Sequence, residues 1–110
     1  MKEIYEALRE IRTEGKNAAL ATIVRTRGST PREVGTKMVV REDGRFFGTI
    51  GGGCGEAEVW AEAMQVIRKT KRPRLMSVDL TEDTAMDEGM ICGGVMDVFI
   101  EPILPAPTGS

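Results

Sequence analysis

The feature that most constrains this chain is a glycine-rich stretch at residues 49–56, which reads Thr-Ile-Gly-Gly-Gly-Cys-Gly-Glu. An apolar, strand-like run leads into it, and a helix-like pattern follows at once. A strand, a glycine turn and a helix in this order can direct free backbone N–H groups and a helix N-terminus toward an anion. The alternative is that the glycines serve only a tight turn with positive φ.

The length and composition indicate one domain with an aliphatic core. The chain has 110 residues, near the commonest domain size. Only 5% of the residues are aromatic, so Val, Ile, Leu, Met and Ala must fill the interior. We place the domain at residues 1–102 and interpret the proline-rich residues 103–110 as a tail or linker.

The charge pattern narrows the function classes. A formal net charge of −2 lacks the basic footprint of nucleic-acid binders, so we expect no nucleic-acid partner. No apolar run is long enough to span a membrane, so we expect a cytoplasmic protein without a membrane partner. The chain has no histidine, which removes the usual general base and most metal sites.

Hydrophobic periodicity predicts two main helices and about five short strands. The helices are expected at residues 2–14, ended by Gly15, and at residues 55–70. The strands are expected at residues 18–24, 37–41, 45–50, 75–80 and 95–101, with an Asp-Gly hairpin turn between the second and third. This is an α+β domain, a two-layer arrangement with both helices on one mixed sheet. Val59, Trp60, Ala63, Met64 and Ile67 are expected to be the buried stripe of the second helix.

The densest cationic stretch is the polar, proline-broken segment 25–36, which we interpret as a loop. It holds Arg25, Arg27 and Arg32 among serine and threonine hydroxyls. Guanidinium groups bind phosphate through a planar fork, so the loop suits an anionic ligand. The alternative is a solvated loop with scattered arginines.

Two glycine-flanked cysteines carry the remaining chemistry. Cys54 lies just before the second predicted helix, where a helix N-terminus lowers a thiol pKa. Cys92 begins a second glycine stretch, Cys-Gly-Gly. Two cysteines are too few for a zinc site, but thiolates can contact a softer metal or carry sulfur. Both could instead be small buried thiols, and we expect no disulfide between them.

Three segments together resemble the XdhC/CoxI family, in its N-terminal domain. They are Gly-Ser-Thr-Pro-Arg at 28–32 with Lys-Met-Val-Val at 37–40, the glycine turn at 48–56, and Cys-Gly-Gly at 92–94 with Val-Phe-Ile-Glu-Pro at 98–102. The resemblance implies an accessory protein, not an enzyme, for molybdenum hydroxylases such as xanthine dehydrogenase and carbon monoxide dehydrogenase. It implies that the chain binds molybdenum cofactor, protects it during sulfuration and delivers it to the apo-enzyme. A cysteine desulfurase and a second copy of the chain are further expected partners.

The resemblance and the residue chemistry together predict the cofactor contacts. Cys54 and Cys92 are expected near the molybdenum, as ligands or as sulfur relays. Many family members carry a second, Rossmann-like domain that this sequence does not contain, so we predict no NAD binding. The full set of predicted contacts is Arg27, Ser29, Arg32, Gly51, Gly52, Gly53, Cys54, Glu56, Cys92, Gly93 and Gly94.

Two other interpretations stay open at this point. The chain could be an enzyme that uses Cys54 or Cys92 as a nucleophile on a phosphorylated small molecule, although a cysteine nucleophile usually has a paired base. It could also be an interaction module whose glycines serve only turns. We expect Cys54, Cys92 and the loop at 27–32 to open onto the same face of the domain, whereas in an interaction module neither cysteine should lie near this loop.

Overall fold

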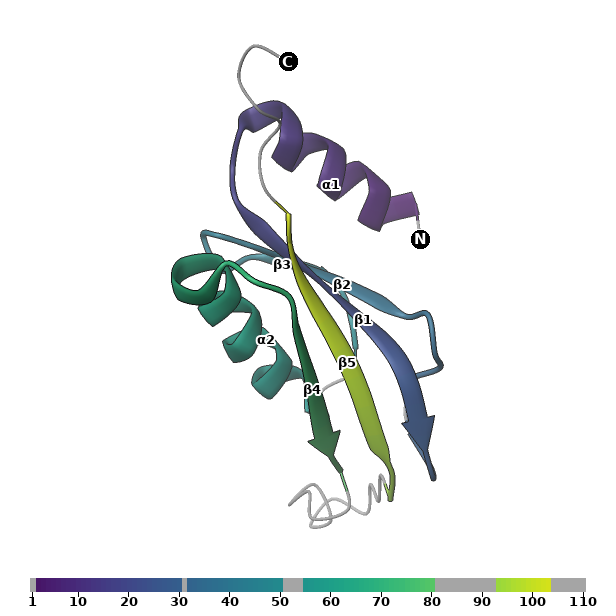
Figure 1. The fold of residues 1–110 in the computed structure, drawn as a ribbon. Helices are drawn as coiled ribbons and strands as arrows, with labels where there is room; N and C mark the ends of the chain where they lie inside the picture. The colour runs from purple at the N-terminus through teal and green to yellow at the C-terminus, as the bar shows by residue number, and fades with distance from the viewer. Residues whose placement is uncertain (1, 31, 51–54, 81–92, 104–110) are drawn as a thin grey trace.

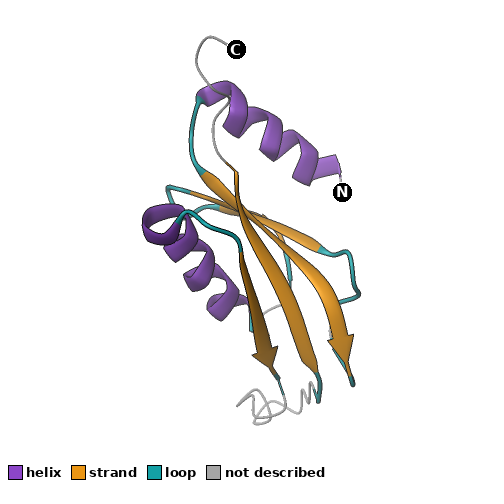
Figure 2. Cartoon of the chain, viewed as in Figure 1, coloured by secondary structure: helices purple, strands orange, loops and turns teal. Residues whose placement is uncertain are grey.

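The computed structural model describes residues 2–30, 32–50, 55–80 and 93–103 of the chain, as a single sheet with two helical segments (Figures 1 and 2). The helices and strands, in chain order, are α1 Lys2–Glu14, β1 Ala18–Arg27, β2 Lys37–Arg41, β3 Phe46–Gly48, α2 Glu56–Gln65 with its π-helical continuation η1 Val66–Thr70, β4 Arg74–Asp79 and β5 Val95–Ile103.

The five strands form one sheet in the order β3-β2-β1-β5-β4, and every neighbouring pair is antiparallel. The predicted α+β class is therefore confirmed, but the expectation of a mixed sheet is wrong. The helical connection after β3 carries the chain to the far edge of the sheet, where β4 forms. β5 then returns between β4 and β1, so no two neighbouring strands run in the same direction.

The two helices pack on opposite faces of the sheet, whereas the sequence predicted both in one layer. Alternate residues of β1 separate the two cores: Ala19, Ala21 and Ile23 join the α2 side, and Ala18 and Leu20 join the α1 side. A central strand that is apolar at consecutive positions can bury both faces, which the run from residue 18 to 24 already indicated. The face of the sheet opposite α2 is covered by α1, which lies over β2 and β3.

The core on the α2 side is the larger of the two. It draws side chains from all the strands except β3, and from both parts of the second helical segment. Its buried members are Ala19, Ala21, Ile23, Met38, Val40, Ile50, Val59, Ala63, Met64, Val66, Ile67, Val78, Leu80, Met96, Val98 and Ile100.

The predicted helix ends agree closely with the structure. Gly15 ends α1 with φ +68°, and the N–H groups of Gly15 and Lys16 bond to the carbonyls of Arg12 and Ile11, a Schellman pattern. The second helical segment ends at Thr70, as expected, although its last turn is a π-helix.

Two further sequence expectations need correction. Trp60 is not a core residue, because 37% of it is exposed while the other four members of the predicted stripe are buried. β1 continues three residues beyond Val24, so Arg25 and Arg27 belong to a strand and not to a loop. Pairing of β1 with β5, through a register shift between Ile23 and Arg25, holds this extension in the sheet.

The C-terminal strand passes the predicted domain boundary by one residue. β5 ends at Ile103, and residues 104–110 lie outside the described part of the chain. The division of the chain at residue 102 stays a prediction. Among the described residues, no helix is both long and apolar enough to cross a membrane.

We predict that α1 is held on the sheet mainly by its buried stripe. Ile11 is fully buried in the smaller core, so Ile11→Ala should lower the free energy of unfolding by about 2–5 kcal/mol. Tyr5 on the same helix is 62% exposed, so Tyr5→Ala should change it by no more than about 0.5 kcal/mol. Urea denaturation of the two variants measures both values. Equal losses would contradict the assigned packing of α1.

Candidate functional site

Three glycine-containing segments meet at one end of the sheet. β1 and β4 run in the same direction and end at Arg27 and Asp79, both opposite the first residue of β5, Val95. The glycine-serine loop leaves from β1 at this end, and Gly93 and Gly94 enter β5 there (Figure 1). The sequence placed these segments far apart, and the antiparallel sheet brings them together.

Gly94 lies so close to the loop after β1 that no side chain would fit there. A Cβ atom on Gly94 would stand 2.5 Å from the carbonyl oxygen of Ser29 and 2.6 Å from that of Arg27. A Cβ atom on Gly28, which has φ +74°, would stand 3.0 Å from the oxygen of Gly93. The two segments therefore pack backbone against backbone, which only glycine allows.

The end of the long glycine turn joins the same region. Gly55 has φ +70°, and a Cβ atom there would stand 2.5 Å from Cγ1 of Val78 and 3.1 Å from Cδ2 of Leu80. Leu80 in turn donates its N–H to the carbonyl of Gly94, at 2.9 Å. A continuous set of contacts thus connects the start of α2, the end of β4, the start of β5 and the loop after β1.

The predicted cofactor contacts fall into two groups. Gly51, Gly52, Gly53, Cys54 and Cys92 lie outside the described residues. The remaining predicted contacts are described, and those on the loop after β1 and at the start of β5 lie at the sheet end. Ser29, Arg32 and Gly93 are exposed there, whereas Gly94 is buried.

Arg27 is less available than the sequence suggested. Its guanidinium lies 3.7 Å from a carboxylate oxygen of Asp97 across the β1–β5 pair. The same oxygen accepts a 2.7 Å hydrogen bond from the hydroxyl of Ser77. Arg32 has no ion pair within the described part of the chain. At this end of the sheet, Arg32 is therefore less neutralised than Arg27.

Glu56 acts within the protein, a role that the sequence did not indicate. The hydroxyl of Thr49 donates a hydrogen bond to Oε2 of Glu56. Thr49 follows β3 and Glu56 begins α2, so this bond joins the two sides of the glycine turn. A carboxylate in the first turn also favours the helix dipole.

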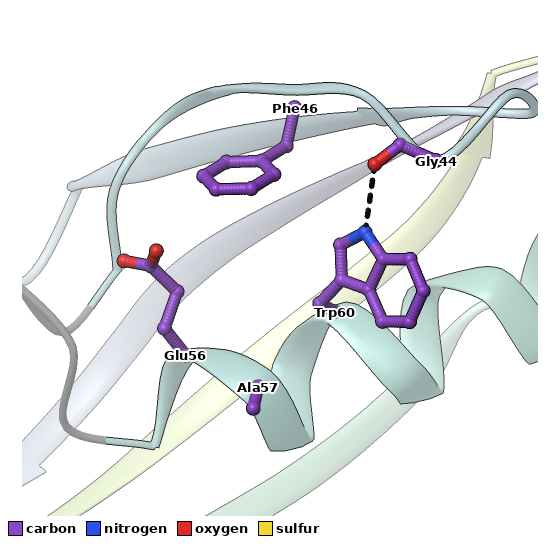
Figure 3. A pocket seen from close by; sticks show the side chains of 5 residues that line it. All are labelled: Gly44, Phe46, Glu56, Ala57 and Trp60. Atoms are coloured by element: carbon purple, nitrogen blue, oxygen red, sulfur yellow. Dashed lines mark hydrogen bonds between the residues drawn. The ribbon is translucent and has the colours of Figure 1, made fainter.

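A groove lies beside this bond, between the β2–β3 hairpin and α2 (Figure 3). Its volume is about 480 Å³, and its lining residues are Gly44, Phe46, Glu56, Ala57 and Trp60. The indole N–H of Trp60 donates a 2.9 Å hydrogen bond to the carbonyl of Gly44, and 47% of Phe46 is exposed. Sequence reasoning missed this groove. Strand alternation could have revealed half of it, because Phe47 packs toward α1 and its neighbour Phe46 must then face the other side.

The hairpin turn that presents the Gly44 carbonyl is itself held in place. The backbone N–H of Arg45 donates to a carboxylate oxygen of Asp43 at 3.0 Å. This bond, with the nearby charges of Arg41, Arg45 and Lys16, lowers the pKa of Asp43 below its usual value. The ionised carboxylate therefore supports the turn on which Trp60 depends.

Within the described residues, no group of three or more Cys, Asp or Glu side chains could hold a metal ion. Among the described residues at the sheet end, the groups available to a ligand are exposed backbone, hydroxyls and the Arg32 guanidinium. Such groups bind an anion or a polar ligand.

Comparison with known proteins identifies the family. A profile described as the XdhC and CoxI family matches residues 11–79, more than half of the chain. The chain belongs to the XdhC and CoxI family. The matched range runs from the end of α1 to the end of β4, and it includes all five residues that line the groove.

Curated relatives of this XdhC and CoxI family chain are considerably longer than the part that they share with it. The Escherichia coli K12 uncharacterized protein YqeB is 46% identical over 74% of this chain and 15% of its own length. The Escherichia coli K12 molybdenum cofactor insertion chaperone PaoD is 49% identical over 48% of this chain and 17% of its own. A Bacillus subtilis 168 protein described as a probable xanthine dehydrogenase subunit is 29% identical over 94% of this chain and 32% of its own.

A solved structure has the same fold. The crystal structure of a Bacillus halodurans protein described as a xanthine dehydrogenase superposes with a TM-score of 0.72 and 29% sequence identity. The match covers 89% of this chain and 30% of that one. This family domain is therefore also found as part of a larger polypeptide.

We predict that the two adjacent glycines before β5 differ sharply in tolerance. Gly94→Ala should lower the free energy of unfolding by about 1–3 kcal/mol, because its Cβ would overlap two backbone carbonyl oxygens. Gly93→Ala is the matched control, since a Cβ there meets no atom within 4 Å. Thermal or urea unfolding measures both. Similar values for the two variants would argue against the close approach of the loop and β5.

Proposed function

We propose that this XdhC and CoxI family chain is a molybdenum cofactor chaperone. It binds the cofactor, protects it, and helps to insert it into a molybdenum hydroxylase of the xanthine dehydrogenase or carbon monoxide dehydrogenase type. In this proposal it works in the cytoplasm as an accessory factor and does not itself catalyse a reaction. The observation that carries the proposal is the meeting of three glycine segments at one sheet end, in a chain similar to an insertion chaperone.

The chemistry of the cofactor suits the residues at this end. Molybdenum cofactor has a phosphate, a pterin with several hydrogen-bonding edges, and a dithiolene that holds the metal. Ser29 and Arg32 are exposed beside the glycine segments and suit the phosphate. We assign the backbone of residues 51–53 to the anionic end of the cofactor, and Cys54 and Cys92 to the neighbourhood of molybdenum. These assignments rest on the sequence.

The proposal also implies partners. The receiving partner is the apo-form of a molybdenum hydroxylase, which takes the cofactor from the chaperone. A cysteine desulfurase is the proposed source of the sulfur that the cofactor acquires before insertion. A second copy of the chain is a third proposed partner.

The test is direct measurement of the cargo. The chain is purified from a host that produces molybdenum cofactor, and from a matched host that does not. We expect molybdenum, and the fluorescence of the oxidised pterin, only in the first preparation, and activation of an apo-hydroxylase when the two are mixed. Equal signals from the two preparations would contradict the proposal. Turnover of a phosphorylated compound that is lost in Cys54→Ala or Cys92→Ala would favour the enzyme alternative instead.

We predict that Arg32 contributes to cofactor retention and that Arg68 does not. Both side chains are exposed, but Arg32 lies in the loop at the sheet end and Arg68 lies in η1, near the end of the second helical segment. Losing one charge-assisted contact should cost about 1.5–3 kcal/mol, so Arg32→Ala should bind roughly tenfold to a hundredfold more weakly. Bound molybdenum per chain after dialysis gives the measurement. Equal retention by the Arg32→Ala and Arg68→Ala variants would remove the loop from the site.

A further inference from the structure

We propose that the groove between the β2–β3 hairpin and α2 is the subsite for the pterin ring of the cofactor. The ring would lie against Phe46 and Trp60 and present its 2-amino-4-oxo edge to Glu56 (Figure 3). This inference rests on the proposed function and assigns a place to one part of the cargo. The groove also has chemistry that can be tested with a free pterin.

The groove exposes two aromatic side chains together. Phe46 is 47% exposed and Trp60 is 37% exposed, and they come from different elements, β3 and α2. A single exposed aromatic residue is ordinary. Two that line the same hollow form one exposed apolar patch, and such patches are typical of ligand-binding sites. Flat heterocycles stack on such rings at low cost, because every heteroaromatic ring has a π-face.

The Trp60 ring is held in position before any ligand arrives. Its N–H donates to the Gly44 carbonyl at 2.9 Å, and the turn that carries Gly44 is supported by Asp43. Side-chain freedom that is already lost in the free protein is not lost again on binding. The indole N–H is also satisfied within the protein, so the exposed part of the ring offers its apolar surface.

Glu56 supplies the polar end of the groove. The Thr49 hydroxyl occupies one site on Oε2, and an ionised carboxylate has about four acceptor sites in all. The 2-amino-4-oxo edge of a pterin carries two adjacent N–H donors, which match the remaining acceptors of a carboxylate held in place. A lumazine ring has a carbonyl where pterin has the amino group, so it loses one donor and faces the carboxylate with an acceptor.

Charge also decides which part of the cofactor enters the groove. The Glu56 carboxylate repels the phosphate and the oxo-metal end, so the ring is the part that we expect there. A volume of about 480 Å³ lies in the ordinary range for small-molecule sites and accommodates a bicyclic ring.

The experiment uses the fluorescence of Trp60, which is the only tryptophan in the chain. The cofactor-free chain is titrated with 6-hydroxymethylpterin and with lumazine, which lacks the 2-amino group. We expect saturable quenching by the pterin, and binding of lumazine that is weaker by about tenfold or more, because one donor to the carboxylate is lost. Absence of quenching by the pterin, or equal binding of lumazine, would overturn the inference.

Matched variants test each wall of the groove. Phe46→Ala and Glu56→Gln should weaken pterin binding by about tenfold or more, because one removes a stacking surface and the other removes a charged acceptor. Glutamine can still accept the Thr49 hydroxyl, so the glycine turn keeps its closing bond. Glu58→Gln changes the other acidic residue of the same first turn, and Leu75→Ala changes an exposed side chain outside the groove.

The two control variants, Glu58→Gln and Leu75→Ala, should bind the pterin as tightly as the unchanged chain does. Circular dichroism and thermal melts establish that every variant is folded. If Glu56→Gln and Glu58→Gln bind the pterin equally, the Glu56 carboxylate does not recognise the 2-amino-4-oxo edge, and the inference fails.

The variants separate this inference from the proposed function. If the chain retains molybdenum cofactor equally well with Phe46→Ala and Glu56→Gln, the groove is not the pterin subsite, while the chaperone function stands. If the free pterin binds in the groove but purified chain never carries molybdenum, the chaperone function fails. The groove would then be a site for a pterin alone.

Discussion

The architecture at the candidate site depends on one close contact, in which the backbone at Gly94 lies against the carbonyls of Arg27 and Ser29. This contact sets the distance between the loop after β1 and the start of β5. Because a Cβ atom would overlap both oxygens, any side chain at this position must push the loop away. The hydrogen bond from Leu80 to Gly94 extends the same arrangement to the end of β4. The glycines thus act through packing, besides any contact that their amides make with an anion.

The central position of β1 makes this contact possible. Small side chains at Ala18, Ala19 and Ala21 let helices pack on both faces of the strand. With its first half buried on both sides, β1 is a rigid base for the loop that it carries at its other end. The second half leaves the core and exposes Arg25 and Arg27, so a single strand supplies both the core and one border of the site.

Charge is distributed unevenly around the site. Arg32 is exposed on the loop after β1, whereas the groove beside α2 ends in the Glu56 carboxylate. The Thr49–Glu56 hydrogen bond closes the glycine turn from the groove side, so the same carboxylate serves the turn and lines the groove.

Local periodicity and turn chemistry were enough to predict several features before any fold was known. These are both helical segments, the Asp-Gly hairpin, the alternation of β5 and the end of α1 at Gly15, since near neighbours decide each of them. The family was also readable at that level, because its three short motifs occur in order along the chain. The strand order was not readable from the sequence. In the structure, the sheet is antiparallel and not mixed, and the two helices lie on opposite faces of it. The partners of single side chains were likewise decided by the folded chain. Trp60 donates a hydrogen bond to a hairpin turn 16 residues away, and Arg27 of β1 pairs with Asp97 of the neighbouring strand β5. Such contacts join positions that are distant in the chain, and no local pattern encodes which of them will meet.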